Sequence, residues 1–284
     1  MDWLTGYKIP IGKTAKQVFD WLQDNASGFF DLVSIVMESF IDWLLWILQS
    51  PSPLIMVAIF TGIAYGLQRS WKIALLTLLG LLLIINQGYW EEATESLALV
   101  LSSSFVCMAL GVPIGIFAAR PPRFYTYLAP ILDLMQTLPT FVYLIPAIVF
   151  FGIGMVPGLI ATVIFVLPAP IRLTHLGITN VPEDQKEAAD SFGATKWQKL
   201  RNVEIPNALP QIMTGLNQTI MLSLSMVVIA ALVGADGLGV PVVRALNSVN
   251  TSLGFESGIV IVIVAILLDR ILRIHPKKSS SSHG

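Results

Sequence analysis

The sequence predicts an all-α, polytopic transmembrane helical bundle. Only 12% of its 284 residues are charged and 55% are hydrophobic, whereas roughly 25% of residues are charged in soluble domains. The apolar residues gather into stretches near the roughly 20 residues that a helix needs to cross a bilayer. The longest polar run, at 182–206, separates two of these stretches. We therefore expect about seven spans, preceded by an amphipathic helix at the membrane interface and interrupted by a cytosolic helical loop.

The N-terminal segment, 1–52, is expected to be a tail followed by the amphipathic helix at 29–48. With 100° per residue, Asp31, Glu38 and Asp42 fall within about 40° of each other on that helix. An interfacial position suits them, because each acid at the bilayer centre would cost about 2.5–3.5 kcal/mol. A spanning helix whose acids face a helical bundle is the alternative.

The apolar stretches that follow predict the spans. The expected spans are 53–68, 73–87, 96–119, 135–151, 156–173, 209–234 and 258–272. The first two are short and joined by a basic turn, so six or eight spans are also compatible with the sequence. We divide the chain into accessory spans at 53–95, a transmembrane core at 96–275 and a disordered polar tail at 276–284.

Positive charge predicts the orientation of the bundle, because loops rich in Lys and Arg stay in the cytoplasm. The basic residues that fall on one common side are Arg69, Lys72, Arg120, Arg123, those within 172–201, Arg270, Arg273, Lys277 and Lys278. The polar run then lies inside, and the acidic cluster at 91–95 and the loop at 235–255 lie outside. The balance of 17 basic and 18 acidic residues gives no reason to expect a nucleic-acid partner.

The polar run predicts two short helices joined by a glycine corner. Pro182 suits a first helical position, and Gly193 stands where the first helix would end. Thr195 and Gln198 match a capping box, so the second helix should begin at once. We expect Pro206 to stop it.

The same run resembles the EAA loop of ABC importer permeases, whose pattern ends in Ile-x-Leu-Pro. The resemblance departs from that pattern conservatively at Val203 and Ile205. It implies a coupling helix that docks on a separate ATP-hydrolysing subunit, with a polar contact, two small residues for close docking and a glycine corner. An ordinary solvated amphipathic loop is the alternative. The residues that carry the resemblance are Glu187, Ala188, Ala189, Gly193, Val203, Ile205 and Pro206.

Two polar stripes within predicted spans are candidates for a translocation path, because polar side chains in lipid gather where helices face each other or water. Each stripe places residues at helical spacing on one face. Hydrogen bonds between packed helices would explain the same residues equally well. The first stripe is Gln136, Thr140 and Tyr143, and the second is Thr214, Gln218 and Ser225 with the adjacent Asn217.

The runs at 133–147 and 225–239 make the resemblance specific to one group of ABC importer permeases. They look like the permeases of glycine betaine and proline betaine importers, over roughly 88–272. Membership would imply uptake of a quaternary-ammonium compatible solute across a bacterial cell membrane. It would also imply a homodimer, two cytosolic ATPases that carry ATP and Mg, and a separate external substrate-binding protein. A choline or carnitine type of permease is the alternative within this family.

Several other functions have little support. Gly12-Lys13-Thr14 lies too far from Gly6 for a phosphate-binding loop and follows no strand, and no metal-ligating cluster is visible. We therefore expect a transport subunit without catalytic residues or cofactors. An ion-coupled transporter would usually place acids at mid-membrane, and no predicted span has one there. A channel or carrier, and a membrane scaffold or sensor, remain the other classes.

Overall fold

The computed structural model describes residues 10–120 and 122–272, and every regular element in these ranges is a helix. The all-α prediction is therefore confirmed. Residues 1–9, the predicted tail at 276–284 and the basic residues Arg273, Lys277 and Lys278 lie outside the described residues. The helices are α2 (Ile11–Gln49), α3 (Pro53–Gln68), α4 (Trp71–Asn86), α5 (Trp90–Ala118), α6 (Pro122–Thr137), α7 (Thr140–Phe151), α8 (Met155–Val166), α9 (Pro168–Thr179), α10 (Glu183–Ser191), α11 (Lys196–Lys199), α12 (Ile205–Ala230), α13 (Gly239–Ser248) and α14 (Thr251–Leu272).

Between four and six stretches of the described chain are long and apolar enough to cross a membrane. The four continuous ones are Trp90–Ala118, Met155–Thr179, Lys196–Val233 and Thr251–Leu272. Counting each of two sharply bent helix pairs as one span, α2 with α3 and α6 with α7, gives six. The expected count of seven is not confirmed, because α4, at 16 residues, reaches only about 24 Å.

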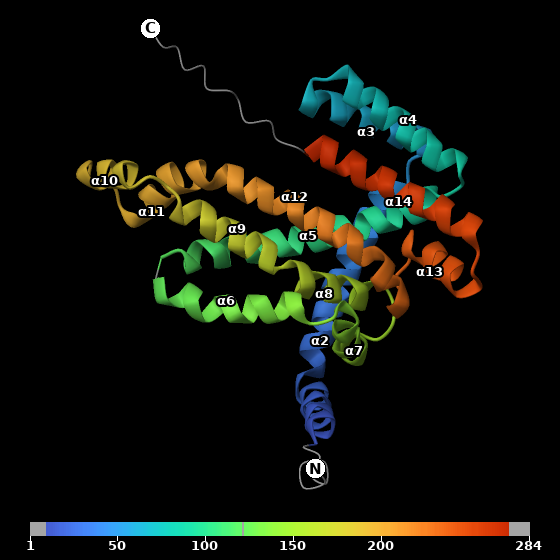
Figure 1. Cartoon of the computed structure of the whole chain (residues 1–284), viewed down its shortest axis with the longest axis horizontal. Helices are drawn as coiled ribbons and strands as arrows, with labels where there is room; N and C mark the ends of the chain where they lie inside the picture. Colours follow the sequence, from blue (N-terminus) through green and yellow to red (C-terminus); the bar gives the residue numbers. More distant parts are fainter. Residues whose placement is uncertain (1–9, 121, 273–284) are drawn as a thin grey trace, which may run out of the picture.

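The centre of the bundle is built from α5, α9 and α12, which lie side by side (Figure 1). Glycines on α5 let the backbone of α9 come close: a Cβ on Gly111 would lie 2.7 Å from Pro170 Cγ. A Cβ on Gly115 would lie 2.7 Å from both the Ile171 carbonyl oxygen and Thr174 Cβ. Such small residues allow tight helix packing where lipid offers no hydrophobic driving force.

Replacing Gly115 with leucine is expected to destabilise the bundle by at least about 1–3 kcal/mol, the usual cost of overpacking. The added side chain would meet the α9 backbone, which cannot move aside as a flexible side chain could. The midpoint of thermal unfolding in detergent measures the effect. Gly62→Leu is the matched control, because a Cβ on this helical glycine meets nothing within 4 Å. Equal unfolding midpoints for both variants would contradict this account of the packing.

The predicted span at 135–151 is not one continuous helix, because the chain breaks within it. α6 ends at Thr137, and α7 leaves it at an angle of 94°. Pro139 stands at the break, where it lacks a backbone donor and disfavours helical geometry at the residue before it. The Tyr143 hydroxyl donates a hydrogen bond to the Met135 carbonyl oxygen at 2.7 Å. This bond ties the start of α7 to the end of α6.

The prediction that Pro206 stops a helix is wrong. A π-helical turn, Leu200–Glu204, joins α11 to α12, and the Ile205 N–H donates to the Leu200 carbonyl oxygen five residues back. Pro206 is the second residue of α12 and directly follows this wider turn. The helix therefore continues from the polar loop into the membrane.

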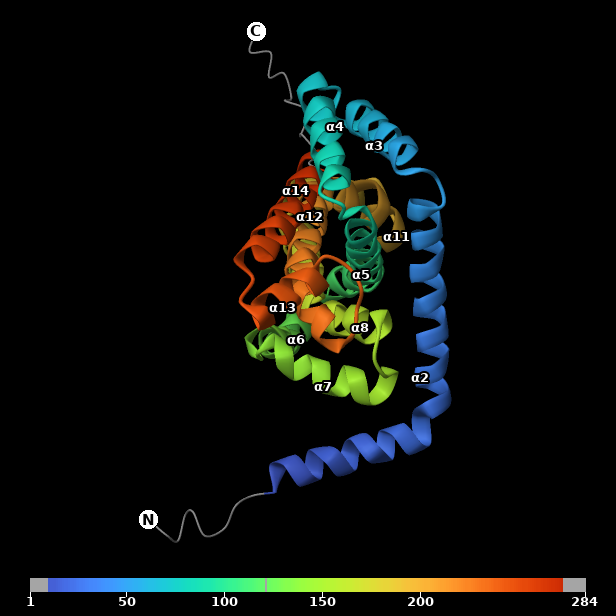
Figure 2. The same cartoon turned by 90° about the vertical axis from the view of Figure 1, so that its right-hand side faces the viewer.

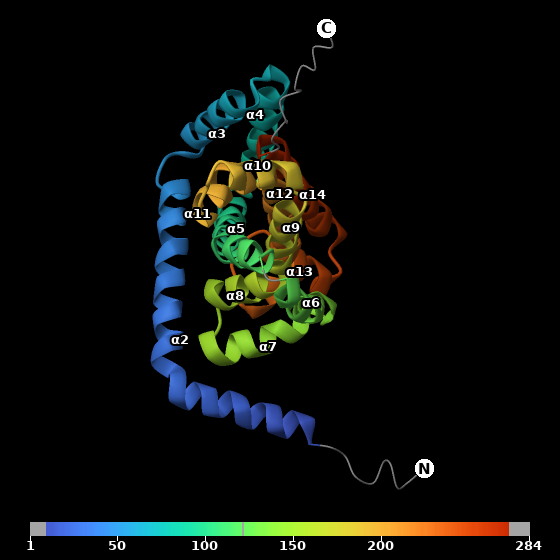
Figure 3. The ribbon, with the colours of Figure 1, turned by 90° about the vertical axis from the view of Figure 1, so that its left-hand side faces the viewer.

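α2 is a long helix with a kink at Ala26, whose φ and ψ are −125° and 18°. The part after the kink lies against α5, α7 and α8 and crosses the long helices of the bundle rather than running beside them (Figures 2 and 3). Its three acids are exposed, while Ile41 and Leu48 on another face are buried. The acids and the buried residues thus lie on different faces of the helix, and the crosswise course fits an interfacial helix. Its position in a membrane stays a prediction.

The two ends of the bundle differ in charge, as the orientation argument requires. The α5–α6 connection and the α10–α11 loop lie toward the left of Figure 1, and the α3–α4 turn and the end of α14 lie at the left ends of their helices. These elements carry most of the basic residues of the described chain. Toward the opposite end, Glu91, Glu92, Glu95 and Asp236 line one cavity of about 220 Å³ together with Arg244.

Candidate functional site

The α10–α11 loop projects beyond the other helices at the basic end of the bundle (Figure 1). Gly193 forms its corner with φ of +74°. The Gly193 N–H donates to the Asp190 carbonyl oxygen at 2.9 Å, and the Ala194 N–H donates to that of Ala189 at 3.0 Å. This pair of bonds is a Schellman motif, which ends a helix and usually needs glycine at its left-handed position. The predicted glycine corner is confirmed.

The second helix of the loop starts with the predicted capping box. The Thr195 N–H donates to Gln198 Oε1 at 2.8 Å, and Thr195 Oγ1 accepts from the Gln198 N–H at 3.3 Å. Lys199 Nζ forms an ion pair with Asp190 at 2.7 Å across the corner. Pro182 caps α10 one residue before the predicted position. The corner is therefore fixed by backbone bonds, a cap and a charge pair.

The outer surface of this corner exposes two large aromatic side chains. Phe192 is 91% exposed and Trp197 is 67% exposed. Glu187 and Ala188 beside them are exposed too, and Ala189 is half-buried. Exposed aromatic groups at the tip of a polar loop indicate a docking surface, because such side chains anchor protein interfaces. Sequence reasoning did not select Trp197, although a tryptophan within a polar run could have signalled it.

The last three residues of the EAA-like pattern do not belong to that exposed tip. Val203 lies in the π-helical turn, where its carbonyl oxygen accepts a hydrogen bond from Asn207 Nδ2 at 2.8 Å. Ile205 packs on a buried cluster that includes Leu200, and Pro206 opens α12. These residues join the exposed corner to α12.

The second polar stripe lies on the continuous helix α12, so its shared face is confirmed. Thr214, Gln218 and Ser225 are all exposed in the single chain. The Thr214 hydroxyl donates to the Pro210 carbonyl oxygen at 2.9 Å. Asn217, adjacent to the stripe, has a buried Oδ1 atom without a partner in the described chain.

The first polar stripe does not form one helical face, because Gln136 is on α6 whereas Thr140 and Tyr143 are on α7. Tyr143 is 7% exposed, and its hydroxyl is occupied by the Met135 carbonyl oxygen. The structure therefore gives Tyr143 a role in fixing the bend between the two helices. The prediction of a continuous stripe here is wrong.

One charge pair within the bundle was missed. Arg172 Nη2 on α9 forms an ion pair with Asp133 Oδ1 on α6 at 2.6 Å. The rings of Tyr125 and His175 stack between the same two helices, with their centroids 3.6 Å apart. Asp133 lies just before the predicted span at 135–151, and the sequence gave it no partner. Among the described residues no group of three or more metal-ligating side chains could hold an ion.

Comparison with known proteins defines the class. The family described as "Binding-protein-dependent transport system inner membrane component" matches residues 111–279. The chain belongs to this family, so it is a permease, that is, a transport component, and a multi-pass inner-membrane protein.

Full-length relatives make the class more specific. The glycine betaine transport system permease protein OpuAB of Bacillus subtilis strain 168 is 46% identical, covering 98% of both chains. The glycine betaine/carnitine transport permease protein GbuB of Listeria monocytogenes is 43% identical over 96% of this chain and 98% of its own. ProW of Escherichia coli K12, a glycine betaine/proline betaine transport system permease protein, is 40% identical over 96% of this chain and 77% of its own.

A solved structure supports the fold. The inward-facing MetNI methionine ABC transporter matches 65% of this chain and 94% of its own with a TM-score of 0.59 and 23% identity. The arrangement of the core helices is therefore that of an ABC transporter permease.

Proposed function

We propose that the chain is the transmembrane subunit of an ATP-driven importer for glycine betaine or proline betaine, which passes the solute inward by alternating access. All three relatives above have glycine betaine in their names. Carnitine occurs in one of those names and in that of a permease that is 30% identical over 63% of this chain. Betaine import is therefore better supported than a choline or carnitine type.

The single observation that carries the proposal is the exposed corner between α10 and α11. A fixed backbone corner with bare aromatic groups, Phe192 and Trp197, is suited to insert into a groove on another protein. We assign that partner as a cytosolic ATPase that holds ATP and Mg. Two ATPase copies would serve a homodimer of this chain. The basic residues at the same end of the bundle support a cytoplasmic position for the corner.

The helix that follows the corner supplies a mechanical link. The stretch Lys196–Val233 runs on through the π-helical turn and carries the polar stripe of Thr214, Gln218 and Ser225. When ATP draws the two ATPase subunits together, each corner moves with its partner. A continuous helix transmits that motion to the stripe, so the bundles rock between inward-open and outward-open states.

The side chains of the polar stripe suit a translocation path rather than a high-affinity binding site. Its residues are hydroxyls and an amide without charge, so they can solvate a zwitterion and still release it, as transport requires. Strong selection of a quaternary ammonium group needs an aromatic cage. We assign that cage to an external binding protein.

The test is uptake of labelled glycine betaine into proteoliposomes that contain the chain, its ATPase and its binding protein. We expect uptake only when ATP is present on the side of the membrane where the ATPase lies. We also expect choline and carnitine to compete with glycine betaine more weakly than proline betaine does.

Gln218→Trp should reduce uptake by at least about tenfold, because the indole ring would fill the translocation path. Val262→Trp on the exposed face of α14 is the control. Uptake by the chain alone, driven by an ion gradient, would refute the proposal.

A further inference from the structure

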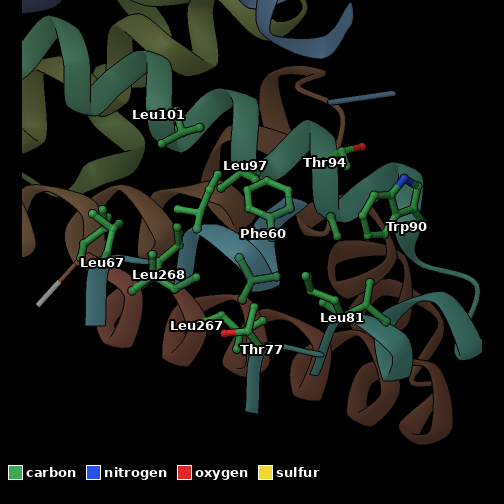
Figure 4. A pocket seen from close by; sticks show the side chains of 16 residues that line it. Phe60, Leu67, Thr77, Leu81, Trp90, Thr94, Leu97, Leu101, Leu267 and Leu268 are labelled. Atoms are coloured by element: carbon green, nitrogen blue, oxygen red, sulfur yellow. The ribbon is translucent and has the colours of Figure 1, made fainter. Parts of the chain in front are cut away.

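A narrow apolar cavity lies between α3, α4, α5 and α14, away from the polar stripe (Figure 4). Its volume is about 190 Å³. Phe60 and Leu97 line its middle, Trp90 stands at one end, and Leu67 and Leu268 stand at the other. Along α5 the lining reaches from residue 90 to 101, which corresponds to a slot about 16 Å long.

The cavity offers nothing to water or to a zwitterionic solute. Both hydroxyl groups in its wall are already used: Thr77 donates to the Ile73 carbonyl oxygen at 2.9 Å, and Thr94 donates to that of Glu91 at 2.7 Å. A trapped water needs two to four polar partners. A cavity of this volume is too small for an α-helix, which is about 10 Å across. The occupant that fits is a single flexible hydrocarbon chain.

Basic side chains gather at the end marked by Leu67 and Leu268. The Gln68 side chain donates a hydrogen bond to the Ile271 carbonyl oxygen at 2.8 Å, which brings the α3–α4 turn beside the last turn of α14. Arg69 on that turn, Lys72 at the start of α4 and Arg270 on α14 are exposed.

These three cations are nearly without acidic partners. Arg69 and Lys72 form no ion pair with the part of the chain that the structure describes, and Arg270 has only a 4.0 Å contact with its neighbour Asp269. Trp71, the first residue of α4, is exposed, as suits a residue at the lipid headgroups.

We propose that this is a binding site for an anionic phospholipid. One acyl chain occupies the apolar slot, and the phosphate group lies against Arg69, Lys72 and Arg270. The inference does not depend on the transported solute. It gives the accessory helices α3 and α4 a role, because a lipid seated between them and α5 and α14 would hold them to the core.

Lipid-dependent thermal stabilisation of the purified full chain tests the site. Phosphatidylglycerol should raise the unfolding midpoint more than phosphatidylcholine does. Each charge near an anionic headgroup changes affinity by about fivefold. Replacing Arg69, Lys72 and Arg270 with glutamine should therefore weaken apparent phosphatidylglycerol binding by roughly a hundredfold.

A control variant removes equal charge elsewhere, with Lys13, Lys16 and Arg123, all exposed, changed to glutamine. It should bind phosphatidylglycerol like the unmodified chain. An equal loss of phosphatidylglycerol affinity in the two triple variants would mean general charge attraction and would overturn the site.

A second variant tests the slot. Leu97→Trp should fill it and remove the tightly held lipid that native mass spectrometry detects, whereas Leu110→Trp, on an exposed position of the same helix, should keep it. Retention of that lipid by Leu97→Trp, or equal stabilisation of the unmodified chain by both lipids, would overturn the proposal.

Discussion

Replacing Gly193 with valine is expected to abolish ATP-driven uptake while the chain stays folded. The corner needs φ of +74° at this position, and a left-handed conformation costs an ordinary residue about 1–2 kcal/mol; branching at Cβ makes it worse. The space around Gly193 is open, so the valine side chain would not disturb the spans. The corner would instead adopt another geometry and point Phe192 away from the ATPase.

Uptake in proteoliposomes and the midpoint of thermal unfolding separate these two effects. We expect uptake to fall by at least about tenfold with Gly193→Val, while the unfolding midpoint stays within a few degrees of the original. Gly193→Asn is the matched control, since asparagine tolerates the left-handed conformation and should retain most uptake. Normal uptake by the valine variant would remove the role assigned to the corner.

Truncating Phe192 and Trp197 to alanine is expected to release the ATPase. Buried aromatic anchors each contribute about 2 kcal/mol or more at protein interfaces, so each change should weaken association by roughly thirtyfold. Both side chains are largely exposed in the single chain, so their removal should not unfold it.

Pull-down of the ATPase in detergent, followed by ATPase activity in the assembled transporter, measures this effect. Tyr127→Ala is the control, because Tyr127 is an equally bare aromatic residue on α6 at 75% exposure and lies outside the corner. Undiminished association of the double alanine variant would show that the partner docks elsewhere. Loss with Tyr127→Ala would point to a general loss of folding.

Local chemistry made the corner predictable. The Schellman motif at Gly193 and the capping box of Thr195 with Gln198 involve residues only a few positions apart, so distant contacts cannot easily override them. The polar stripe on α12 was predictable for the same reason, because a continuous helix preserves its spacing.

The chain breaks at one proline and continues as a helix at another. At Pro139 the chain breaks by 94°, whereas at Pro206 a wider π-helical turn lets the helix go on. The same residue type permits either result, and only the surrounding packing decides between them. The first stripe failed as a prediction because it spanned the break at Pro139.

Contacts between residues far apart in the chain could not be predicted from the sequence. The ion pair of Arg172 with Asp133 joins positions 39 residues apart, and neither residue alone signals the other. The number of spans was uncertain for a related reason: α3 and α4 have 16 residues each, near the limit at which a helix can cross a bilayer without help from its neighbours.

Native mass spectrometry of the complex, purified gently from its own membrane, tests the central claim most directly. We expect a particle with two copies of this chain and two copies of an ATPase that has a phosphate-binding loop. Recovery of this chain alone, under conditions that keep other membrane complexes intact, would contradict the importer account and favour an ion-coupled transporter or a channel.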